Sequence, residues 1–230
     1  MGGGSGGGGK AEKWRFGHGF RARQTAWPPA TTGQALAVEL GCGRSKVDGL
    51  PGHDDVLGVD WHEFEGVHVV TDLDAMAAHK GWAWAEESSC SLVICHQTLE
   101  HLRNLIPVMN EIWRICDEEA HVEIVVPYGI GKPALQDPTH VRFFTEMTFR
   151  YWEPGFVDDF SDYGIRGYFA ICAQDWRQDG NLWVLLAPLT EEEAERWREL
   201  RALTDDGIVR WPAPQWLLDR GAMLLGDAEP

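Results

Sequence analysis

The chain has 230 residues, of which 44% are hydrophobic and 24% charged, a composition typical of one globular domain. Its formal net charge of −16 repels phosphate backbones and its basic residues are dispersed, so DNA or RNA is a poor candidate partner. Five cysteines without a Cys-x-x-Cys pair, and no apolar run long enough to span a bilayer, favour a soluble cytoplasmic protein with reduced thiols and exclude a membrane-spanning chain.

The chain divides into four predicted segments. Residues 1–10 are rich in glycine and are expected to form a disordered tail, and residues 11–34, which contain a Pro28-Pro29 stop, are expected to form an N-terminal arm. Residues 35–204 contain the periodic pattern of one domain. Residues 205–230 form a C-terminal extension that packs back on the domain or on a second subunit, and its Trp and Leu residues make a homodimer a partner to consider.

Short apolar runs alternate with helical patterns in the first two thirds of the domain. This alternation predicts a Rossmann-like α/β fold with a doubly wound, mainly parallel sheet. Strands are expected at residues 36–40, 56–59, 67–70, 91–95 and 122–126, and helices at 74–87 and 99–116.

The pattern changes after the fifth strand. Residues 129–144 have the composition of a loop and 145–152 that of a short helix, and residues 168–176 and 181–187 flank Asp179-Gly180 as an antiparallel hairpin. Thr190, followed by three glutamates, marks the start of a helix that runs to about residue 203.

Polar side chains stand where the predicted parallel strands end. In an open parallel sheet, ligands bind beyond these carboxyl ends. The first strand ends in a Gly-x-Gly turn, and glycine lets a ligand approach the backbone. A single aspartate at a strand end is more often a helix cap or a turn former, but the joint pattern favours a binding site. The residues concerned are Glu39, Gly41, Gly43, Asp60, Asp72 and His96.

The glycine turn lacks the features of two common nucleotide sites. A dinucleotide-binding turn needs a third glycine where this chain has Lys46, and no G-x-x-x-x-G-K-[ST] loop is present. The predicted ligand is therefore a nucleoside without a pyrophosphate. Asp60 is placed to accept hydrogen bonds from a ribose, and Trp61 beside it to stack on a base.

Four blocks in this order make the chain similar to the class I S-adenosylmethionine-dependent methyltransferases, over about residues 35–152. The resemblance implies a seven-stranded sheet with an antiparallel last hairpin, an enzyme, and S-adenosyl-L-methionine as its cofactor. One departure is Ser45, where many members have a third glycine. The matching blocks are residues 38–43, 58–60, 71–73 and 95–102, with 111–115 as a further match.

The resemblance also implies roles for individual residues. The glycine turn would approach the methionine part of the cofactor, with Glu39 near its amino group. Asp60 would hold the ribose, and Asp72 and Leu73 the adenine. The full set of predicted cofactor-binding residues is Glu39, Gly41, Cys42, Gly43, Asp60, Trp61, Asp72, Leu73, Cys95, His96 and Gln97.

The methyl acceptor implied is a small molecule, with oxygen as the atom methylated and secondary metabolism as a setting. His140 is the predicted general base and His101 the residue that orients its loop. Tyr128, Asp137 and Arg142 are predicted to bind the acceptor, although Arg142 is equally well explained by a salt bridge.

Three alternatives remain open from the sequence. His96, His101, His140 and Asp137 are good metal ligand types, but the carboxylates of the metal-dependent catechol-type branch are not apparent, so no metal is predicted. The chain could instead be a catalytically silent cofactor-binding or interaction protein. It could also be a methyltransferase that acts on protein or RNA.

Overall fold

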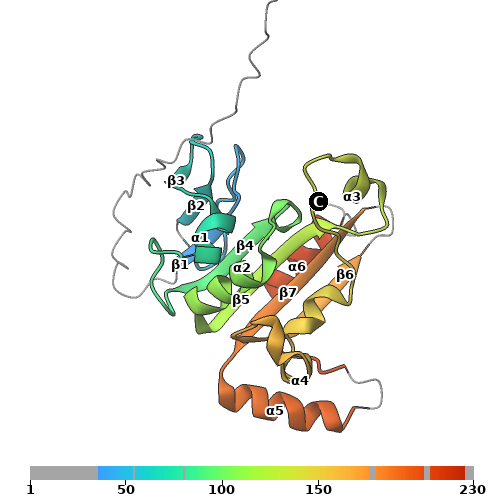
Figure 1. Ribbon diagram of the computed structural model, residues 1–230. Helices are drawn as coiled ribbons and strands as arrows, with labels where there is room; N and C mark the ends of the chain where they lie inside the picture. The colour runs from blue at the N-terminus through green and yellow to red at the C-terminus, as the bar shows by residue number, and fades with distance from the viewer. Residues whose placement is uncertain (1–35, 54, 80, 177–179, 205–207, 226–230) are drawn as a thin grey trace, which may run out of the picture.

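The computed structural model describes residues 36–53, 55–79, 81–176, 180–204 and 208–225. Seven strands form one sheet in the order β3-β2-β1-β4-β5-β7-β6 (Figure 1). Strand β7 is antiparallel to both of its neighbours and the other pairs are parallel, which confirms the predicted fold class. The strands are β1 Leu36–Leu40, β2 Val56–Asp60, β3 Val67–Val70, β4 Cys90–His96, β5 Cys116–Pro127, β6 Tyr168–Trp176 and β7 Asn181–Leu189.

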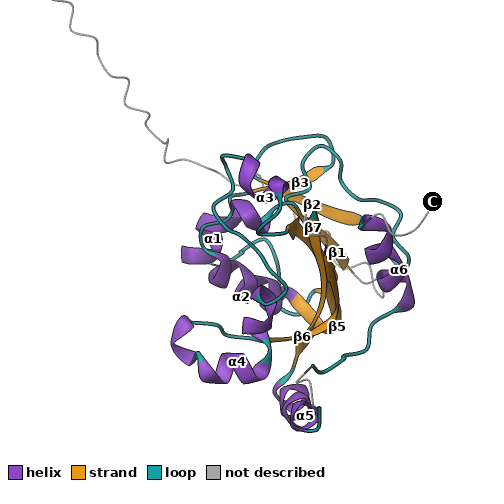
Figure 2. Ribbon diagram, turned by 90° about the vertical axis from the view of Figure 1, so that its right-hand side faces the viewer, coloured by secondary structure: helices purple, strands orange, loops and turns teal. Residues whose placement is uncertain are grey.

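Helices lie on both faces of the sheet. Figure 2 shows α1, α2 and α4 on one face and α6 on the other, with α5 at one end. No helix in the described part of the chain is long and apolar enough to cross a bilayer. The helices are α1 Leu73–His79, α2 Leu105–Ile115, α3 Lys132–Gln136, α4 Pro154–Asp159, α5 Glu191–Ala202 and α6 Gln215–Leu224, and the 3₁₀ turns are η1 Leu99–His101, η2 Thr148–Trp152 and η3 Ser161–Tyr163.

The central strands are apolar along their whole length because both faces of the sheet are covered. Every residue of β2 and four of the five in β1 are buried. The described residues between β1 and β2 contain no helix. Helix α6 supplies cover on the second face instead, where Leu217 packs into a cluster with Ala37, Leu92 and Trp183.

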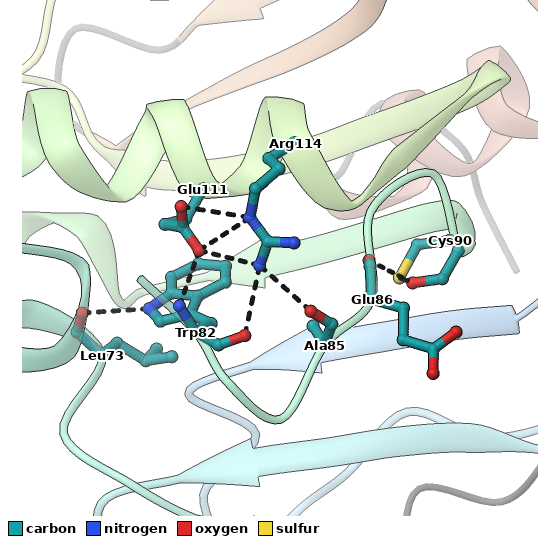
Figure 3. A network of polar contacts seen from close by, with 8 residues as sticks. Leu73, Trp82, Ala85, Glu86, Cys90, Glu111 and Arg114 are labelled. Carbon is teal, nitrogen blue, oxygen red and sulfur yellow. Dashed lines mark hydrogen bonds and ion pairs between the residues drawn. The ribbon is translucent and has the colours of Figure 1, made fainter. Parts of the chain in front are cut away.

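The helix predicted over residues 74–87 is wrong beyond His79. Gly81 has a φ of +70°, and the chain then forms a loop in which Trp82 and Trp84 are buried and stacked. Glu111 and Arg114 of α2 bind this loop: Glu111 accepts the Trp82 amide at 2.6 Å, and Arg114 donates to the Trp82 and Ala85 carbonyls (Figure 3). Side chains of α2 thus satisfy backbone groups that a longer helix would have paired.

The helix predicted over residues 99–116 is divided in two. The short turn η1 ends at His101, and α2 begins only at Leu105. The amides of Arg103 and Asn104 donate to the Asp74 carboxylate at 3.1 and 2.6 Å, which holds the chain out of the helix between them. This break directs the chain so that His101 reaches the cavity described below.

The remaining boundaries differ less. The predicted loop at residues 129–144 contains the short helix α3, the predicted helix at 145–152 is the 3₁₀ turn η2, and β5 begins six residues before the predicted Val122. The hairpin of β6 and β7 is confirmed, as is the start of α5, where Thr190 and Glu193 form a capping box. The predicted tail at 1–10 and arm at 11–34 lie outside the described residues.

A buried carboxylate fixes α6 to the sheet. Glu123 of β5 is fully buried and accepts hydrogen bonds from Arg220 Nε at 2.7 Å, His96 Nε2 at 3.1 Å and Trp183 Nε1 at 3.4 Å. Burial alone would raise the pKa of Glu123, but the bonds from His96 and Arg220 outweigh it and hold the pKa below its ordinary value. A Cβ on Gly221 would lie 2.3 Å from the Trp183 ring, so the helix approaches the sheet at a glycine.

We predict that Arg220→Met lowers the free energy of unfolding by about 3 kcal/mol at neutral pH, because it leaves a buried charge short of its partner. A lowered pKa contributes stability above the ordinary glutamate pKa and loses it as the pH falls through the folded-state value. The difference in the free energy of unfolding between the variant and the unmodified protein should therefore become smaller as the pH falls. Urea denaturation at several pH values measures both effects.

Arg198→Met is the matched control. Arg198 binds Asp158 and Glu195, whose side chains are 45% and 73% exposed, so its loss should cost less than about 1 kcal/mol. Equal losses for the two arginine variants would contradict the role assigned to Glu123.

Candidate functional site

A cavity of about 610 Å³ opens at the carboxyl ends of β1, β2 and β4. The strand order reverses here, because β2 lies on one side of β1 and β4 on the other. Chains leaving β1 and β4 diverge at such a point, which is where open α/β sheets bind ligands. The cavity is lined by Gly41, Asp60, Trp61, Thr71, Asp72, Leu73, Asp74, Gln97, Thr98, His101, Leu102, Arg103 and Thr139.

The glycine turn packs against Thr98, at the start of η1. Gly41 has a φ of +71°, and a Cβ there would lie 2.1 Å from Thr98 Oγ1. Thr98 Oγ1 also lies 3.1 Å from the Leu40 carbonyl oxygen, so it joins the exits of β1 and β4. The Gly41 amide donates to the Val59 carbonyl at 2.7 Å, which fixes the turn to β2 as well.

Asp60 is buried at the end of β2 and organises the backbone on both sides of it. One carboxylate oxygen accepts the Gly43 amide at 2.9 Å and the other accepts the His62 amide at 2.8 Å. Both bonds leave further lone pairs, because each carboxylate oxygen can accept two hydrogen bonds. The carboxylate therefore holds the turn and can still bind a ligand that donates hydrogen bonds.

Trp61, Asp72 and Leu73 complete this end of the cavity. The Trp61 side chain is 65% exposed, which is unusual for tryptophan. Asp72 Oδ1 accepts the amides of Asp74 and Ala75 at 3.0 Å, so Asp72 also caps α1, as a lone aspartate at a strand end is expected to do.

Five predicted cofactor residues do not line the cavity. Glu39 is buried and accepts the Val47 amide at 2.6 Å, so it closes the loop after the glycine turn. Burial raises the pKa of Glu39, although that bond and nearby His96 oppose the rise. The residues outside the wall are Glu39, Cys42, Gly43, Cys95 and His96.

The other four residues of this set are buried in the core or bonded to residues outside the cavity, apart from Gly43, which bonds to Asp60. Gly43 touches the site through the bond that its amide donates to Asp60. Cys42 and Cys95 are buried, and burial raises the pKa of both thiols, so neither is a ready thiolate. His96 binds Glu123, whereas its neighbour Gln97, with a φ of +50°, does line the cavity.

His101 and Thr139 both line the cavity, and the ring of His101 contacts that of His140. The rings of His101 and His140 make an edge contact with their centres 4.8 Å apart. His140 itself does not line the cavity, and its Nδ1 lies 2.9 Å from the Ala134 carbonyl. His140 was the predicted general base, but His101 is the histidine that reaches the cavity.

Glu100 is a charged residue that the sequence analysis did not select. Its side chain is buried with 1% exposure, and neither carboxylate oxygen has a hydrogen-bond partner in the described structure. Burial raises its pKa to about 7, although nearby His140 opposes the rise. Burial, followed by the charge of His140, lowers the pKa of His101, so His101 is neutral at pH 7.

The three predicted acceptor residues also stand outside the main cavity. The Tyr128 hydroxyl donates to Glu146 at 2.8 Å, and Asp137 accepts the hydroxyl of Thr139 at 2.6 Å. Arg142 donates to the Leu102 and Arg103 carbonyls, and it forms no salt bridge within the described residues. Arg142 instead lines an adjoining cavity of about 340 Å³, and Arg103 lines both cavities.

Thr98, Glu100 and Thr139 are the main residues that sequence reasoning missed. Thr98 and Glu100 lie inside the matching block 95–102, and Thr139 lies beside the predicted base His140, so the available signal was closeness in sequence to predicted site residues. Threonine packing against a glycine leaves no pattern in the sequence, because the two are 57 positions apart and meet only in the fold.

Comparison with known proteins gives structural likeness only. No family model and no curated protein matches the chain. A solved SAM-dependent methyltransferase from Archaeoglobus fulgidus is 14% identical, covers 68% of this chain and 87% of its own, and superposes with a TM-score of 0.44. A SAM-dependent methyltransferase from Aquifex aeolicus is 12% identical over 68% of this chain and 83% of its own, with a TM-score of 0.45. Similarity this low carries no weight of its own, so function must be inferred from the site.

We predict that Gly41→Ala lowers the free energy of unfolding by about 3 kcal/mol, since it combines left-handed backbone strain with a clash against Thr98. Gly49→Ala is the control, because Gly49 has a φ of +69° but open space around its Cβ position. The control should lose only the strain, about 1 kcal/mol. Urea denaturation compares the two, and equal losses would show that the packing of Gly41 on Thr98 is unimportant.

Proposed function

We propose that the protein is an S-adenosylmethionine-dependent methyltransferase with a small-molecule acceptor. The observation that carries this proposal is the meeting of Gly41, Asp60 and Asp72, from the ends of three different strands, around one cavity. Its volume of about 610 Å³ is within the range of about 300–1,000 Å³ common for ligand pockets.

The lining fits the chemistry of the cofactor. Asp60, Asp72 and Asp74 all line the cavity, and negative groups favour a cationic ligand. When bound, S-adenosylmethionine supplies a methyl group on a positively charged sulfur, which an acceptor lone pair displaces to leave neutral S-adenosylhomocysteine.

The residues of this chain would bind and position the two reactants. Asp60 would accept hydrogen bonds from the ribose, Trp61 would stack on the adenine, and Asp72 and Leu73 would contact its edge. Gly41 and Gln97 would lie along the methionine part. Alignment of the reacting atoms is the main requirement, because the methyl donor is intrinsically reactive.

The acceptor would enter from the side of the adjoining cavity. That cavity is lined by the rings of Tyr151, Trp152 and Tyr163 and by the side chains of Arg103 and Arg142. Aromatic walls with guanidinium groups favour a flat or apolar acceptor that carries an anionic group. We propose oxygen as the atom methylated. His101 and His140 would lie where the acceptor oxygen releases its proton.

Calorimetric titration of the full chain with S-adenosylmethionine and with S-adenosylhomocysteine tests the proposal. Binding of both ligands with a stoichiometry near one per chain is the expected result. No heat at millimolar ligand would overturn the function. Binding without transfer to any compound in a broad acceptor panel would favour the catalytically silent alternative.

Within this experiment we predict that Trp61→Ala weakens cofactor binding about tenfold, the usual scale for loss of base stacking. Because Trp61 is 65% exposed, its removal should leave the melting temperature unchanged. Phe143→Ala is the matched control, since Phe143 is 56% exposed and lies outside the cavity. Unchanged affinity in Trp61→Ala would remove the stacking role.

We also predict that Tyr163→Ala raises the KM for the acceptor, about tenfold, without changing cofactor affinity, because Tyr163 lines only the adjoining cavity. An assay with methyl-labelled cofactor and the acceptor found in the panel measures this. Tyr168→Ala, outside both cavities, serves as the control. An unchanged KM in Tyr163→Ala would place the acceptor elsewhere.

A further inference from the structure

Two histidines and a glutamate from separate segments meet at the edge of the main cavity. Glu100 and His101 end the 3₁₀ turn η1, and His140 lies in the loop after α3. The loop is held there by the amides of Val141 and Arg142, which donate to the Glu100 carbonyl at 2.8 and 3.2 Å. One ligand atom from each of Glu100, His101 and His140 lies within 4.8 Å of the other two.

The burial of Glu100 is a second observation that favours a cation at this cluster. A buried carboxylate is costly unless it is paired or hydrogen-bonded. Glu100 has 1% exposure and no hydrogen bond to either carboxylate oxygen in the described structure. The side chains that share this cluster with it are two imidazoles, those of His101 and His140. A bound cation would satisfy both oxygens.

The surrounding hydrogen bonds prepare both imidazoles as ligands. His140 Nδ1 lies 2.9 Å from the Ala134 carbonyl, which can only accept, so Nδ1 carries a proton and Nε2 is the atom through which His140 would bind a metal. This Nε2 lies 3.9 Å from Asp137 Oδ2. His101 Nδ1 lies 3.0 Å from Thr139 Oγ1. The Thr139 hydroxyl donates to Asp137 at 2.6 Å, so it accepts from Nδ1, and Nε2 is the atom through which His101 would bind a metal.

These contacts match the surroundings of known metal ligands. Metal-binding histidines usually donate their other ring nitrogen to a carbonyl or, directly or through a hydroxyl, to a carboxylate, which fixes the tautomer and the ring orientation. Here Ala134 serves His140, and the pair of Thr139 and Asp137 serves His101.

We propose that Glu100, His101 and His140 form a binding site for a divalent transition metal ion of the Zn²⁺ or Fe²⁺ type. Two imidazoles and one carboxylate are the donors such ions prefer, and three protein ligands leave positions for water or substrate. Ligands about 2.1 Å from an ion lie at most about 4.2 Å apart, so the cluster must contract slightly when it binds.

The ion would stand at the wall of the cavity, because His101 and Thr139 both line it. There it could bind the oxygen of an acceptor and lower its pKa; this role rests on the proposed methyl transfer, whereas the metal site does not. The sequence analysis predicted no metal because the fourth strand ends on His96, a histidine that binds Glu123 instead. The ligand carboxylate comes from Glu100, one turn further on.

Metal binding is tested on the untagged full chain after removal of metal with a chelator. The protein is titrated with Co²⁺, which replaces Zn²⁺ or Fe²⁺ and absorbs visible light when bound by nitrogen and oxygen donors. About one Co²⁺ per chain, by elemental analysis, together with a saturable visible band, is the expected result. Absence of saturable binding overturns the proposal, as does the intense near-ultraviolet band of a thiolate complex, which would assign the ion to cysteines.

Ligand variants locate the ion. His101→Ala and His140→Ala should each weaken Co²⁺ binding at least tenfold, on the order of the loss expected for a ligand. His53→Ala is the matched control, because His53 contacts Pro51 and Ser91 and belongs to no part of the cluster. Equal binding by the cluster variants and the control overturns the assignment.

Glu100→Gln keeps the volume of the buried side chain and should also lose the ion. His101→Ala remains informative if Glu100→Gln does not fold.

Titration of the metal-free protein with S-adenosylmethionine separates this inference from the proposed function. If Co²⁺ binds at the cluster and S-adenosylmethionine does not bind, the function fails and the metal site stands. If the cofactor binds and Co²⁺ does not, only the metal site is overturned.

Discussion

The contact between Gly41 and Thr98 is the constraint on which the site depends. It joins the exits of β1 and β4, the two strands between which the order of the sheet reverses. A side chain at position 41 would push these exits apart, since its Cβ would lie 2.1 Å from Thr98. With the exits held together, Asp60 can bind the glycine turn at Gly43, and the cavity forms above both strands.

The sheet needs cover on both faces for its apolar strands to be stable, and this chain provides it in an unusual order. The described residues between β1 and β2 form no helix, and the C-terminal α6 packs on that face. The hydrogen bond from Arg220 to the buried Glu123 fixes the position of α6 on the sheet, and His96 binds the same carboxylate. The end of β4 and the C-terminal helix are thus coupled through one carboxylate, only a residue away from Gln97 in the cavity wall.

The wall of the cavity combines two kinds of chemistry. Carboxylates and an exposed tryptophan line it where the proposed cofactor would bind, and the imidazole of His101, in contact with that of His140, lines it as well. The break between η1 and α2 follows directly after His101, because Asp74 holds the amides of Arg103 and Asn104 away from helical pairing. A continuous helix there would have kept the predicted period but changed the direction of His101.

The sequence by itself determined the sheet, its antiparallel hairpin and the strand ends at Gly41, Asp60 and Asp72, because apolar runs and the residues that end them are local patterns. It could not determine which histidine reaches the cavity, that Cys95 and Glu39 are buried, or that the Glu100 carboxylate is buried without a hydrogen-bond partner in the part of the chain that the structure describes. These facts depend on contacts between distant segments, such as the loop at Val141 bound to the Glu100 carbonyl. Only the tertiary structure decides them, since burial and access are properties of the packed chain and not of any stretch within it.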